Sequence, residues 1–349
     1  MRVLYIDNHL GGHHQEYLKA LTESSTHGSV VILPAKADLP AEIKQYVFSE
    51  DIESKNFAGY RRLISFIKQV ADNENIDVIH FLSFDPLLKY FGVGLKKLRK
   101  YSVIATFHHY RYGRVHDFSR KRIYKRCKYG VVHTKHLKEY SDKLGISNCV
   151  HIEYPVFKDY SGISAKDSRA YWHLNDGSKV LLALGGTRRS KGLDLLLEAL
   201  DGVNEPFQLL IAGSVSDFDK EFVESKTSGY RDKVKMKLCY LTDKEVQMAA
   251  AASDIVVLPY RKVFDGASGP LGEGVILGKC IIGPDHGSLG RIISENHLGY
   301  TFESENIDSL HSTIISSLTN EFVRDEKYKN YQVSLDSRSF VGKYEQLYK

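Results

Sequence analysis

Short apolar runs, rich in Val, Ile and Leu, alternate with longer helix-compatible stretches along this whole chain. Such runs are typical of strands that are buried on both faces, and the stretches between them are long enough for crossover helices. The runs in the first half are 3–6, 30–33, 78–81, 103–107, 130–133 and 150–153, and those in the second half are 180–184, 208–212, 234–238, 255–258, 280–283 and 300–302. The pattern predicts an α/β protein with two Rossmann-like, doubly wound parallel-sheet lobes.

The length of 349 residues also favours two domains, because single cores seldom grow past about 250–300 residues. We place the boundary at Tyr154-Pro155-Val156, which predicts an N-terminal lobe at 1–155 and a C-terminal lobe at 156–335. The remaining segment, 336–349, carries apolar side chains at helical spacing and is predicted to be a helix. Ligands of such sheets bind at the C-terminal ends of the strands, so we expect a cleft between the lobes to hold the site.

The composition favours a cytoplasmic protein without a membrane span. Hydrophobic residues make up 42% of the chain and charged residues 26%, with no long apolar run. The first residues read as a buried strand rather than a signal peptide. The four cysteines lie far apart without metal-ligand spacing, so we expect all of them to be reduced core residues.

The segment 249–283 combines a buried strand, a glycine-rich loop and a helix start. Pro270 marks the first helical turn, so Ser268 or Gly269 is predicted to be its N-cap. The unpaired N–H groups of such a turn attract anions. Asp265 and Glu273 flank this start, with Glu273 predicted in the first turn, where carboxylates can accept hydrogen bonds from sugar or ribose hydroxyls. The alternative is that both acids only favour the turn and the helix start.

A second glycine-rich loop follows the strand at 180–184 and carries the cations Arg188, Arg189 and Lys191. Cations on a glycine turn before a helix suit a diphosphate, and charge-assisted contacts contribute about 1.5–3 kcal/mol each. A merely solvated basic turn is the alternative. Another glycine, Gly213, closes a tight turn after the strand at 208–212.

In the first lobe, Gly11 and Gly12 follow the opening strand and allow close approach of a ligand. The neighbouring histidines 9, 13 and 14 lack a supporting set of carboxylates or cysteines, so we predict no metal there. His108 ends the strand at 103–107 and is expected at the ligand-binding edge of the sheet, although a structural histidine is the alternative.

These segments together resemble the retaining GT-B glycosyltransferases of glycosyltransferase family four, also known as group 1. The two carboxylates match the family's Glu, seven residues, Glu pattern, except that Asp265 stands in the first position. Lys191-Gly192 matches the family's phosphate loop, where Gly186 occupies the usual arginine position, and Ala105-Thr106-Phe107-His108 matches its active-site histidine segment.

The resemblance implies a role for each matched residue. Asp265 and the loop amides of Gly266 and Ala267 would hold the donor sugar, and Glu273 the ribose. Lys191 and Arg188 would stabilise the diphosphate, and His108 would lie near the transferred sugar. The remaining donor-binding residues implied are Gly11, Gly12, Gly186, Gly213, Gly266, Ala267, Ser268 and Gly269. No metal and no cofactor are expected, since the nucleotide-sugar donor is a substrate. The resemblance also implies that the helix predicted at 336–349 crosses back to the first lobe.

Cations outnumber acids strongly between 89 and 128, with aromatic residues between them. The cations are Lys89, Lys96, Lys97, Arg99, Lys100, Arg111, Arg114, Arg120, Lys121, Arg122, Lys125, Arg126 and Lys128, and the aromatic residues are Tyr90, Phe91, Tyr101, Tyr110, Tyr112, Phe118, Tyr124 and Tyr129. Such a pattern can bind an anionic membrane or nucleic acid. Without a nucleic-acid-binding fold, we favour a membrane surface or a lipid-linked acceptor over nucleic acid. A solvated basic face is the alternative.

We therefore predict a metal-independent retaining glycosyltransferase that moves a sugar from a UDP-sugar to a glycan or lipid-linked glycan, at the inner membrane face. One rival is a non-catalytic relative that serves as a partner-binding subunit, which the departures at Gly186 and Asp265 keep open. Another is a nucleotide-sugar epimerase, for which no separate acid and base pair is found. A dehydrogenase is disfavoured because the motif at Gly11-Gly12 does not extend to Gly-x-Gly-x-x-Gly.

Overall fold

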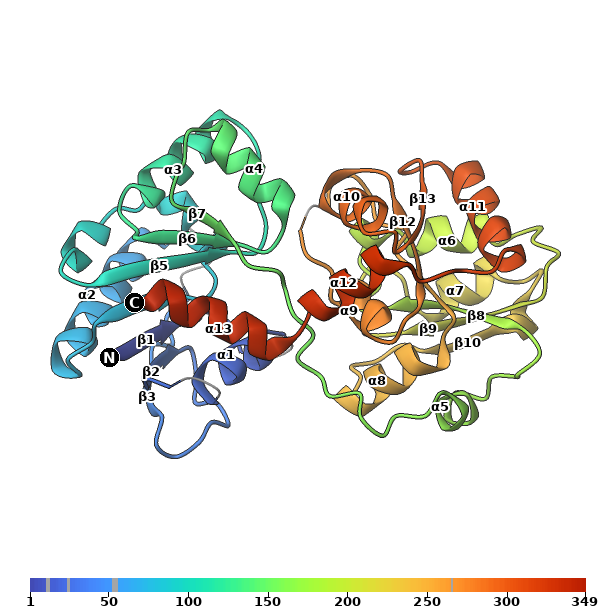
Figure 1. Cartoon of the computed structure of the whole chain (residues 1–349), viewed down its shortest axis with the longest axis horizontal. Coiled ribbons are helices and arrows are strands. Elements are labelled where there is room, and N and C mark those ends of the chain that lie inside the picture. The colour runs from blue at the N-terminus through green and yellow to red at the C-terminus, as the bar shows by residue number, and fades with distance from the viewer. Residues whose placement is uncertain (11–12, 24–25, 52–55, 265) are drawn as a thin grey trace. The chain divides into compact units, whose positions relative to one another are not determined.

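The computed structural model describes residues 1–10, 13–23, 26–51, 56–264 and 266–349, which divide into two compact units (Figure 1). Unit 1 comprises Met1–Phe157 and Asp336–Lys349, and unit 2 comprises Lys158–Leu335. Each unit contains one parallel sheet: seven strands in the order β3-β2-β1-β4-β5-β6-β7, and six in the order β10-β9-β8-β11-β12-β13. The prediction of two parallel-sheet α/β lobes is confirmed.

Unit 1 is built from short, largely apolar strands and the helices between them. Its strands are β1 (Arg2–Ile6), β2 (Gly28–Leu33), β3 (Lys44–Val47), β4 (Val78–Phe81), β5 (Ser102–Phe107), β6 (Tyr129–Val132) and β7 (Cys149–His151). Its helices are α1 (His13–Glu23), α2 (Phe57–Asn73), the 3-10 turns η1 (Asp85–Tyr90) and η2 (Leu95–Leu98), α3 (Arg114–Tyr124), α4 (Lys135–Lys143) and α13 (Ser337–Tyr348).

Alternate side chains of β1 show why this sheet needs helices on both faces. Leu4 and Ile6 pack with α2 in one hydrophobic core, whereas Val3 and Tyr5 pack with α1 and α13 in another. Successive residues of a strand point to opposite faces, so both faces of the sheet are apolar and both are covered. The carboxyl ends of β1, β4 and β5 consequently meet at one edge.

Helix α13 follows unit 2 in the chain but packs on the sheet of unit 1. Asp336 caps it by accepting a hydrogen bond from the Ser339 amide, at 2.8 Å. Phe340 and Tyr344 are buried, and the Tyr344 hydroxyl contacts both the Tyr17 hydroxyl and Thr106 Oγ1. This helix therefore completes one of the two cores of unit 1.

Unit 2 has the same layered plan. Its strands are β8 (Lys179–Leu184), β9 (Phe207–Ala212), β10 (Val234–Lys237), β11 (Ile255–Val257), β12 (Cys280–Pro284) and β13 (Gly299–Phe302). Its helices are α5 (Ala165–Tyr171), the 3-10 turns η3 (Arg189–Lys191) and η4 (Arg231–Lys233), α6 (Leu193–Ala199), α7 (Lys220–Lys226), α8 (Asp243–Ala252), α9 (Gly269–Ile276), α10 (Gly287–Glu295), α11 (Ile307–Thr319) and α12 (Glu326–Ser334). The central strand β8 lies between β9 and β11, so the loops after these three strands are neighbours.

Two details of the structure differ from the sequence predictions. The edge strand β3 was not predicted, because its sequence KQYV begins with two polar residues and none of its four residues is fully buried. Cys239 is exposed, so the expectation that every cysteine lies in a core is wrong for this one, although Cys127, Cys149 and Cys280 are buried. Within the described residues, no helix combines the length and apolar character needed to cross a membrane.

Candidate functional site

The glycine loop after β8 brings Lys191 against its own backbone. Gly185 has a φ of +110°, and a Cβ atom there would lie 2.6 Å from Lys191 Nζ. The loop also touches the turn after β9, since a Cβ atom on Gly213 would lie 2.1 Å from the Gly185 carbonyl oxygen. At Gly186 the nearest group to an added Cβ would be Ser214 Oγ, at 3.1 Å. Glycine is required at 185 and 213 because a side chain would displace the ammonium group or the neighbouring backbone.

Two side chains that the sequence analysis did not single out hold this loop in place. Thr187 Oγ1 donates to the Phe218 carbonyl at 2.7 Å and accepts from the Ser216 amide at 2.9 Å. Arg261 donates to the Arg189 carbonyl at 2.6 Å and forms a bidentate ion pair with Asp194, at 2.9 and 2.7 Å. These bonds link the loop to its flanking elements and restrict the position of Lys191.

The start of α9 lies beside this loop. Ser268 is its N-cap, as predicted, and accepts a hydrogen bond from the Leu271 amide at 3.4 Å. The Tyr260 hydroxyl lies 3.4 Å from Ser268 Oγ, and Lys191 Nζ lies 5.5 Å from the centre of the Tyr260 ring. An ammonium group, a hydroxyl and a capped helix start are thus gathered at the carboxyl ends of the paired strands β8 and β11. Such a set can bind an anion.

Glu273 lies just beyond the first turn of α9, in which it was predicted. The helix begins at Gly269, so Glu273 is its fifth residue and outside the first turn. The residue is buried, with 8% of its surface exposed, and Lys158 and Tyr160 both contact its carboxylate. Lys158 Nζ lies 3.4 Å from Oε1, and the Tyr160 hydroxyl donates to Oε2. A helix dipole alone therefore does not explain this acid.

The other predicted donor-site residues of unit 2 have varied surroundings. Arg188 and Arg189 are both exposed, and the described residues offer neither guanidinium an ion-pair partner. Gly266 is buried, Ala267 is partly buried and Gly269 is exposed. Asp265 lies outside the described residues.

In unit 1, His108 follows β5 at the carboxyl edge of the sheet, where it was predicted. Its backbone amide donates to Asp85 Oδ2 at 2.9 Å, and its Nε2 lies 2.9 Å from the Leu82 carbonyl oxygen. Because that oxygen can only accept, Nε2 carries the proton and Nδ1 is the acceptor of the neutral ring. Burial, helped by the nearby His14 and His109, lowers the pKa of His108 to about 4. The ring is thus uncharged at neutral pH.

The opening loop of unit 1 and the start of α1 place Asp7 and His14 near His108. Asp7 Oδ2 lies 3.0 Å from His14 Nδ1, and the His14 ring centre lies 5.8 Å from that of His108. In the part of the chain that the structure describes, no three His, Cys, Asp or Glu side chains are grouped to hold a metal ion. Gly11 and Gly12, the predicted binding residues of this loop, lie outside the described residues.

The basic stretch 89–128 is less uniform than its sequence suggests. Arg120 is wholly buried: it pairs with Asp117 at 2.6 Å and its guanidinium stacks 3.8 Å from the centre of the Tyr110 ring. Lys100 pairs with Asp72. Four of the predicted interleaving aromatic residues belong to the core, namely Tyr90, Tyr101, Tyr110 and Tyr124. The prediction of one continuous basic and aromatic face is wrong for these residues.

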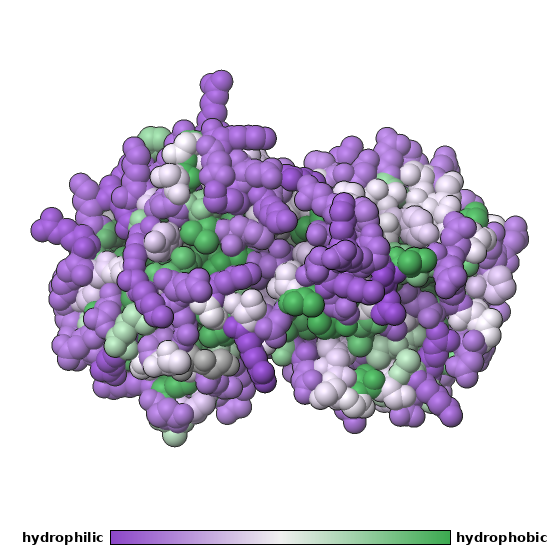
Figure 2. Space-filling view, viewed as in Figure 1, coloured by the Kyte–Doolittle hydropathy of each residue, from purple (hydrophilic) through white to green (hydrophobic). Residues whose placement is uncertain are grey.

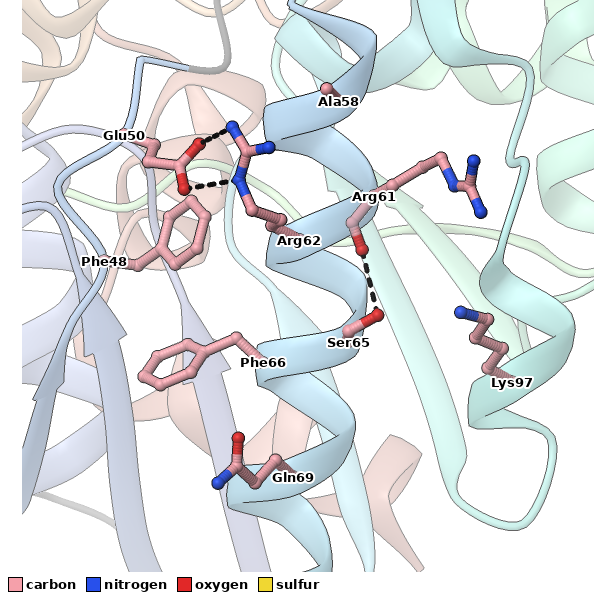
Figure 3. A pocket seen from close by; sticks show the side chains of 9 residues that line it. All are labelled: Phe48, Glu50, Ala58, Arg61, Arg62, Ser65, Phe66, Gln69 and Lys97. Carbon is pink, nitrogen blue, oxygen red and sulfur yellow. Dashed lines mark hydrogen bonds and ion pairs between the residues drawn. The ribbon is translucent and has the colours of Figure 1, made fainter.

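An exposed surface with cations and apolar side chains nevertheless remains on unit 1. The exposed fractions of Tyr112, Val115 and Phe118, at and before α3, are 43%, 65% and 56%. Around α2 lies a shallow pocket of about 570 Å³ (Figure 3), lined by Phe48, Glu50, Ala58, Arg61, Arg62, Ser65, Phe66, Gln69 and Lys97. Glu50 neutralises Arg62 at 2.6 Å, while Arg61 and Lys97 lie together on the other side of the helix. Hydrophilic side chains dominate the face in view, and hydrophobic ones form small patches between them (Figure 2).

Comparison with known proteins relates unit 2 to one family and the whole chain to several solved structures. Residues 164–333 match the family described as glycosyl transferases group 1. Among proteins with curated descriptions, none matches this sequence.

Three solved structures illustrate the likeness of fold. A glycosyltransferase from Rickettsia africae ESF-5 is 18% identical with a TM-score of 0.80, and the match covers 100% of this chain and 97% of that one. A sucrose-phosphate synthase from Thermosynechococcus elongatus is 14% identical with a TM-score of 0.81, covering 99% and 98%. HepE of Anabaena, in complex with UDP and glucose, is 14% identical with a TM-score of 0.74, covering 99% and 98%.

Proposed function

We propose that this chain, whose residues 164–333 match the group 1 glycosyl transferases and whose two lobes have the GT-B fold, transfers a sugar from a UDP-sugar to a glycan or lipid-linked glycan acceptor, with retention at the anomeric carbon. Glycosyl transfer follows from the domain. The nucleotide, the stereochemistry and the acceptor are our proposal, and they rest on the chemistry of the side chains described above.

The observation that carries the proposal is the position of Lys191. Its ammonium group lies against Gly185 and beside Tyr260, and Tyr260 in turn contacts the Ser268 cap of α9. A diphosphate at this place would meet a cation, a hydroxyl and the amides of a helix start. Glu273, on the same helix, would accept hydrogen bonds from ribose hydroxyls.

One further point supports UDP as the nucleotide, and another supports a reaction without a metal ion. HepE of Anabaena, whose fold is similar, holds UDP and glucose in its crystal structure, and another crystal holds UDP-glucose. The Lys191 ammonium group can offset part of the charge of a diphosphate, and the nearby hydroxyls of Tyr260 and Ser268 can donate hydrogen bonds to it. We therefore propose a metal-independent reaction in which the nucleotide sugar is a substrate.

The proposed reaction needs no carboxylate nucleophile. The bond between the anomeric carbon and the β-phosphate oxygen breaks, and UDP leaves with the bonding electron pair. The acceptor hydroxyl attacks from the same face, so the new glycosidic bond retains the configuration, and its proton passes to the departing phosphate oxygen. Lys191 and Arg188 stabilise the negative charge that develops on that oxygen, so catalysis is mainly orientation and electrostatic stabilisation.

His108 serves this reaction as an orienting group rather than a general base. With a pKa of about 4, set chiefly by burial, it is a weak base, and its Nε2–H is committed to the Leu82 carbonyl. We propose that it hydrogen-bonds the transferred sugar. Asp265, with the amides of Gly266 and Ala267, keeps its proposed role of holding sugar hydroxyls.

Calorimetric titration with UDP, GDP and ADP tests the donor site directly. Glu273→Gln and Lys191→Met should each weaken UDP binding by about 10-fold to 100-fold, since each removes a charge-assisted contact of about 1.5–3 kcal/mol. Arg188→Met should weaken it too, and Arg189→Met is the matched control that should not. Binding of UDP that is unaltered in Glu273→Gln and Lys191→Met would refute this donor site.

We also propose that the exposed side of α3 contacts an anionic membrane, where a lipid-linked acceptor would be found. Val115 and Phe118 are three residues apart on the helix, so they share a face. The Arg122 guanidinium lies 5.8 Å from the centre of the Phe118 ring, and the nearby Lys121 and Lys125 are exposed. Apolar side chains beside cations suit the headgroup region, where each cation contributes about 1 kcal/mol.

A further inference from the structure

The first residues of unit 2 contact α9, the helix of the proposed donor site. Lys158 is the first residue of unit 2, and both it and Tyr160 contact the carboxylate of Glu273, which lies more than a hundred residues later in the chain. The side chain of Lys158 is 13% exposed and that of Glu273 is 10% exposed. An ion pair this well shielded is weakened little by salt, so it can hold the carboxylate in one place.

A turn fixes the two contacting residues on the same side. Between them, Asp159 accepts from the Ser161 amide at 2.8 Å and from the Ser161 hydroxyl at 2.6 Å, closing an Asx turn. The Asp159 carbonyl accepts from the Gln247 side chain on α8. Because the turn is tied to α8, the Lys158 and Tyr160 side chains are directed onto α9 rather than left to solvent.

The segment that leaves unit 2 holds the other end of the same helix. Gln332, on α12, donates to the carbonyls of Val275 and Ile276 at 3.1 and 2.8 Å. The Tyr328 hydroxyl donates to the Lys279 carbonyl at 2.8 Å. The segments next to the two unit boundaries therefore both contact α9. The first contacts the Glu273 carboxylate, and the second forms hydrogen bonds with carbonyls at the C-terminal end of the helix.

We propose that Lys158 and Tyr160 are positioning residues, which set the Glu273 carboxylate for the ribose of the donor nucleotide. This inference rests on the proposed role of Glu273. A carboxylate offers about four lone-pair sites, so it can accept from Tyr160 and from two ribose hydroxyls together. A glutamate otherwise samples several rotamers, and binding would have to order them. Lys158 and Tyr160 supply that order before the nucleotide arrives.

Titration of the full chain with two ligands tests the inference. UDP and 2′,3′-dideoxy-UDP differ only in the ribose hydroxyls that Glu273 would accept. Tyr160→Phe and Lys158→Met should each raise the Kd for UDP about threefold to tenfold, the range expected when one side chain must be ordered on binding. Neither variant should change the Kd for the dideoxy ligand, because Glu273 has no hydroxyl to bind there.

Tyr171→Phe is the matched control, since it also removes a hydrogen bond from a tyrosine to a glutamate, Glu245, at 2.9 Å within unit 2. It should leave both ligands unaffected. Adding Tyr160→Phe to Glu273→Gln should cause no further loss of UDP affinity, because the first change acts only through the carboxylate.

The outcomes separate this inference from the proposed function. If Glu273→Gln weakens UDP but Tyr160→Phe and Lys158→Met do not, the positioning role is wrong and the donor site stands. Equal losses for UDP and the dideoxy ligand would mean a general structural effect and would also overturn the positioning role. If Glu273→Gln itself binds UDP like the parent chain, the donor-site assignment fails first.

Discussion

Among single residues, the buried histidines of unit 1 have the most distinctive electrostatics. Burial lowers the pKa of His80 to about 3 and that of His108 to about 4, and it lowers the pKa of His133 as well. His80 lies between the Tyr348 hydroxyl, at 2.8 Å, and Thr106 Oγ1, at 2.9 Å. These rings hold the sheet edge together as neutral hydrogen-bonding groups, and the folded state resists their protonation.

Stability should therefore fall in mild acid. An unfolded histidine has a pKa of about 6.5, so below that pH the unfolded chain binds protons that the folded chain does not. Each such histidine can lower the unfolding free energy by up to about 1.4 kcal/mol per pH unit, from about pH 6.5 down to its folded pKa. Scanning calorimetry should show that the midpoint temperature for unfolding of unit 1 falls as the pH is lowered from 7.5 to 4.5.

The matched variant is His108→Asn, which should lose less stability over the same range because it lacks one of the protonating groups. Parallel curves for the parent chain and this variant would show that His108 is not held neutral by the fold. With a pKa of about 4, His108 stays neutral throughout the range around pH 6.5. The rate of sugar transfer should therefore have the same dependence on pH near 6.5 in the parent chain and in His108→Asn.

Among the elements, α9 and α3 show two different uses of a helix. Helix α9 has its cap, its carboxylate and its C-terminal carbonyls all engaged by unit 2, so it is a rigid support for the Ser268 and Glu273 side chains. Helix α3 instead exposes Val115 and Phe118 beside cations, while Arg120 anchors its inner face through Asp117 and Tyr110. The first arrangement suits binding of a small ligand and the second suits a broad anionic surface.

Binding to lipid vesicles tests the role of α3. Replacing Lys121, Arg122 and Lys125 together with Ser should weaken binding to vesicles containing anionic phospholipid by about 100-fold at low salt, at about 1 kcal/mol per charge. Phe118→Ser should weaken it as well, without changing the charge. The charge-matched control replaces Lys220, Lys226 and Lys244 of unit 2, which are exposed elsewhere. Equal binding by the α3 variant and this control would exclude α3 as the docking element.

Sequence patterns predicted the helices and strands far better than the side-chain contacts between distant parts of the chain. Apolar runs identified the buried strands, because burial on both faces leaves little choice of residue type. The edge strand β3 was not predicted because an edge strand is partly solvated, so its sequence need not be apolar. Glu273 and Lys191 were found through glycine and proline signals, but Tyr160 and Arg261 were not. Their contacts join residues distant in the chain, and no local pattern encodes such a pairing.

For the whole molecule, the two units should fold independently of each other. Unit 2 is one continuous stretch with its own core, so residues 158–335 expressed alone should be folded and should bind UDP like the full chain. Unit 1 needs both of its pieces. Val156 and Asp336 pair in a parallel bridge, so a short Gly-Ser linker from residue 157 to residue 336 should yield a folded unit 1.

Circular dichroism and calorimetry of the two separate units check this expectation, and the fluorescence of Trp172 reports on unit 2, where it is buried. Residues 1–157 alone are the control. They lack Phe340, Tyr344 and Tyr348, so they should be largely unfolded or prone to aggregate. A cooperative melt for residues 1–157 that matches the linked unit would show that α13 is dispensable.

The placement of α13 also sets the order in which the nascent chain can mature on the ribosome. The sheet of unit 1 is translated first, yet one of its apolar faces has no complete cover until residues 336–349 emerge. The whole sequence of unit 2 is translated before that segment. The sheet that is synthesised first is thus completed last. Until α13 packs, the apolar side chains of Val3, Tyr5 and Tyr17 lack part of their cover and are exposed to intermolecular contacts.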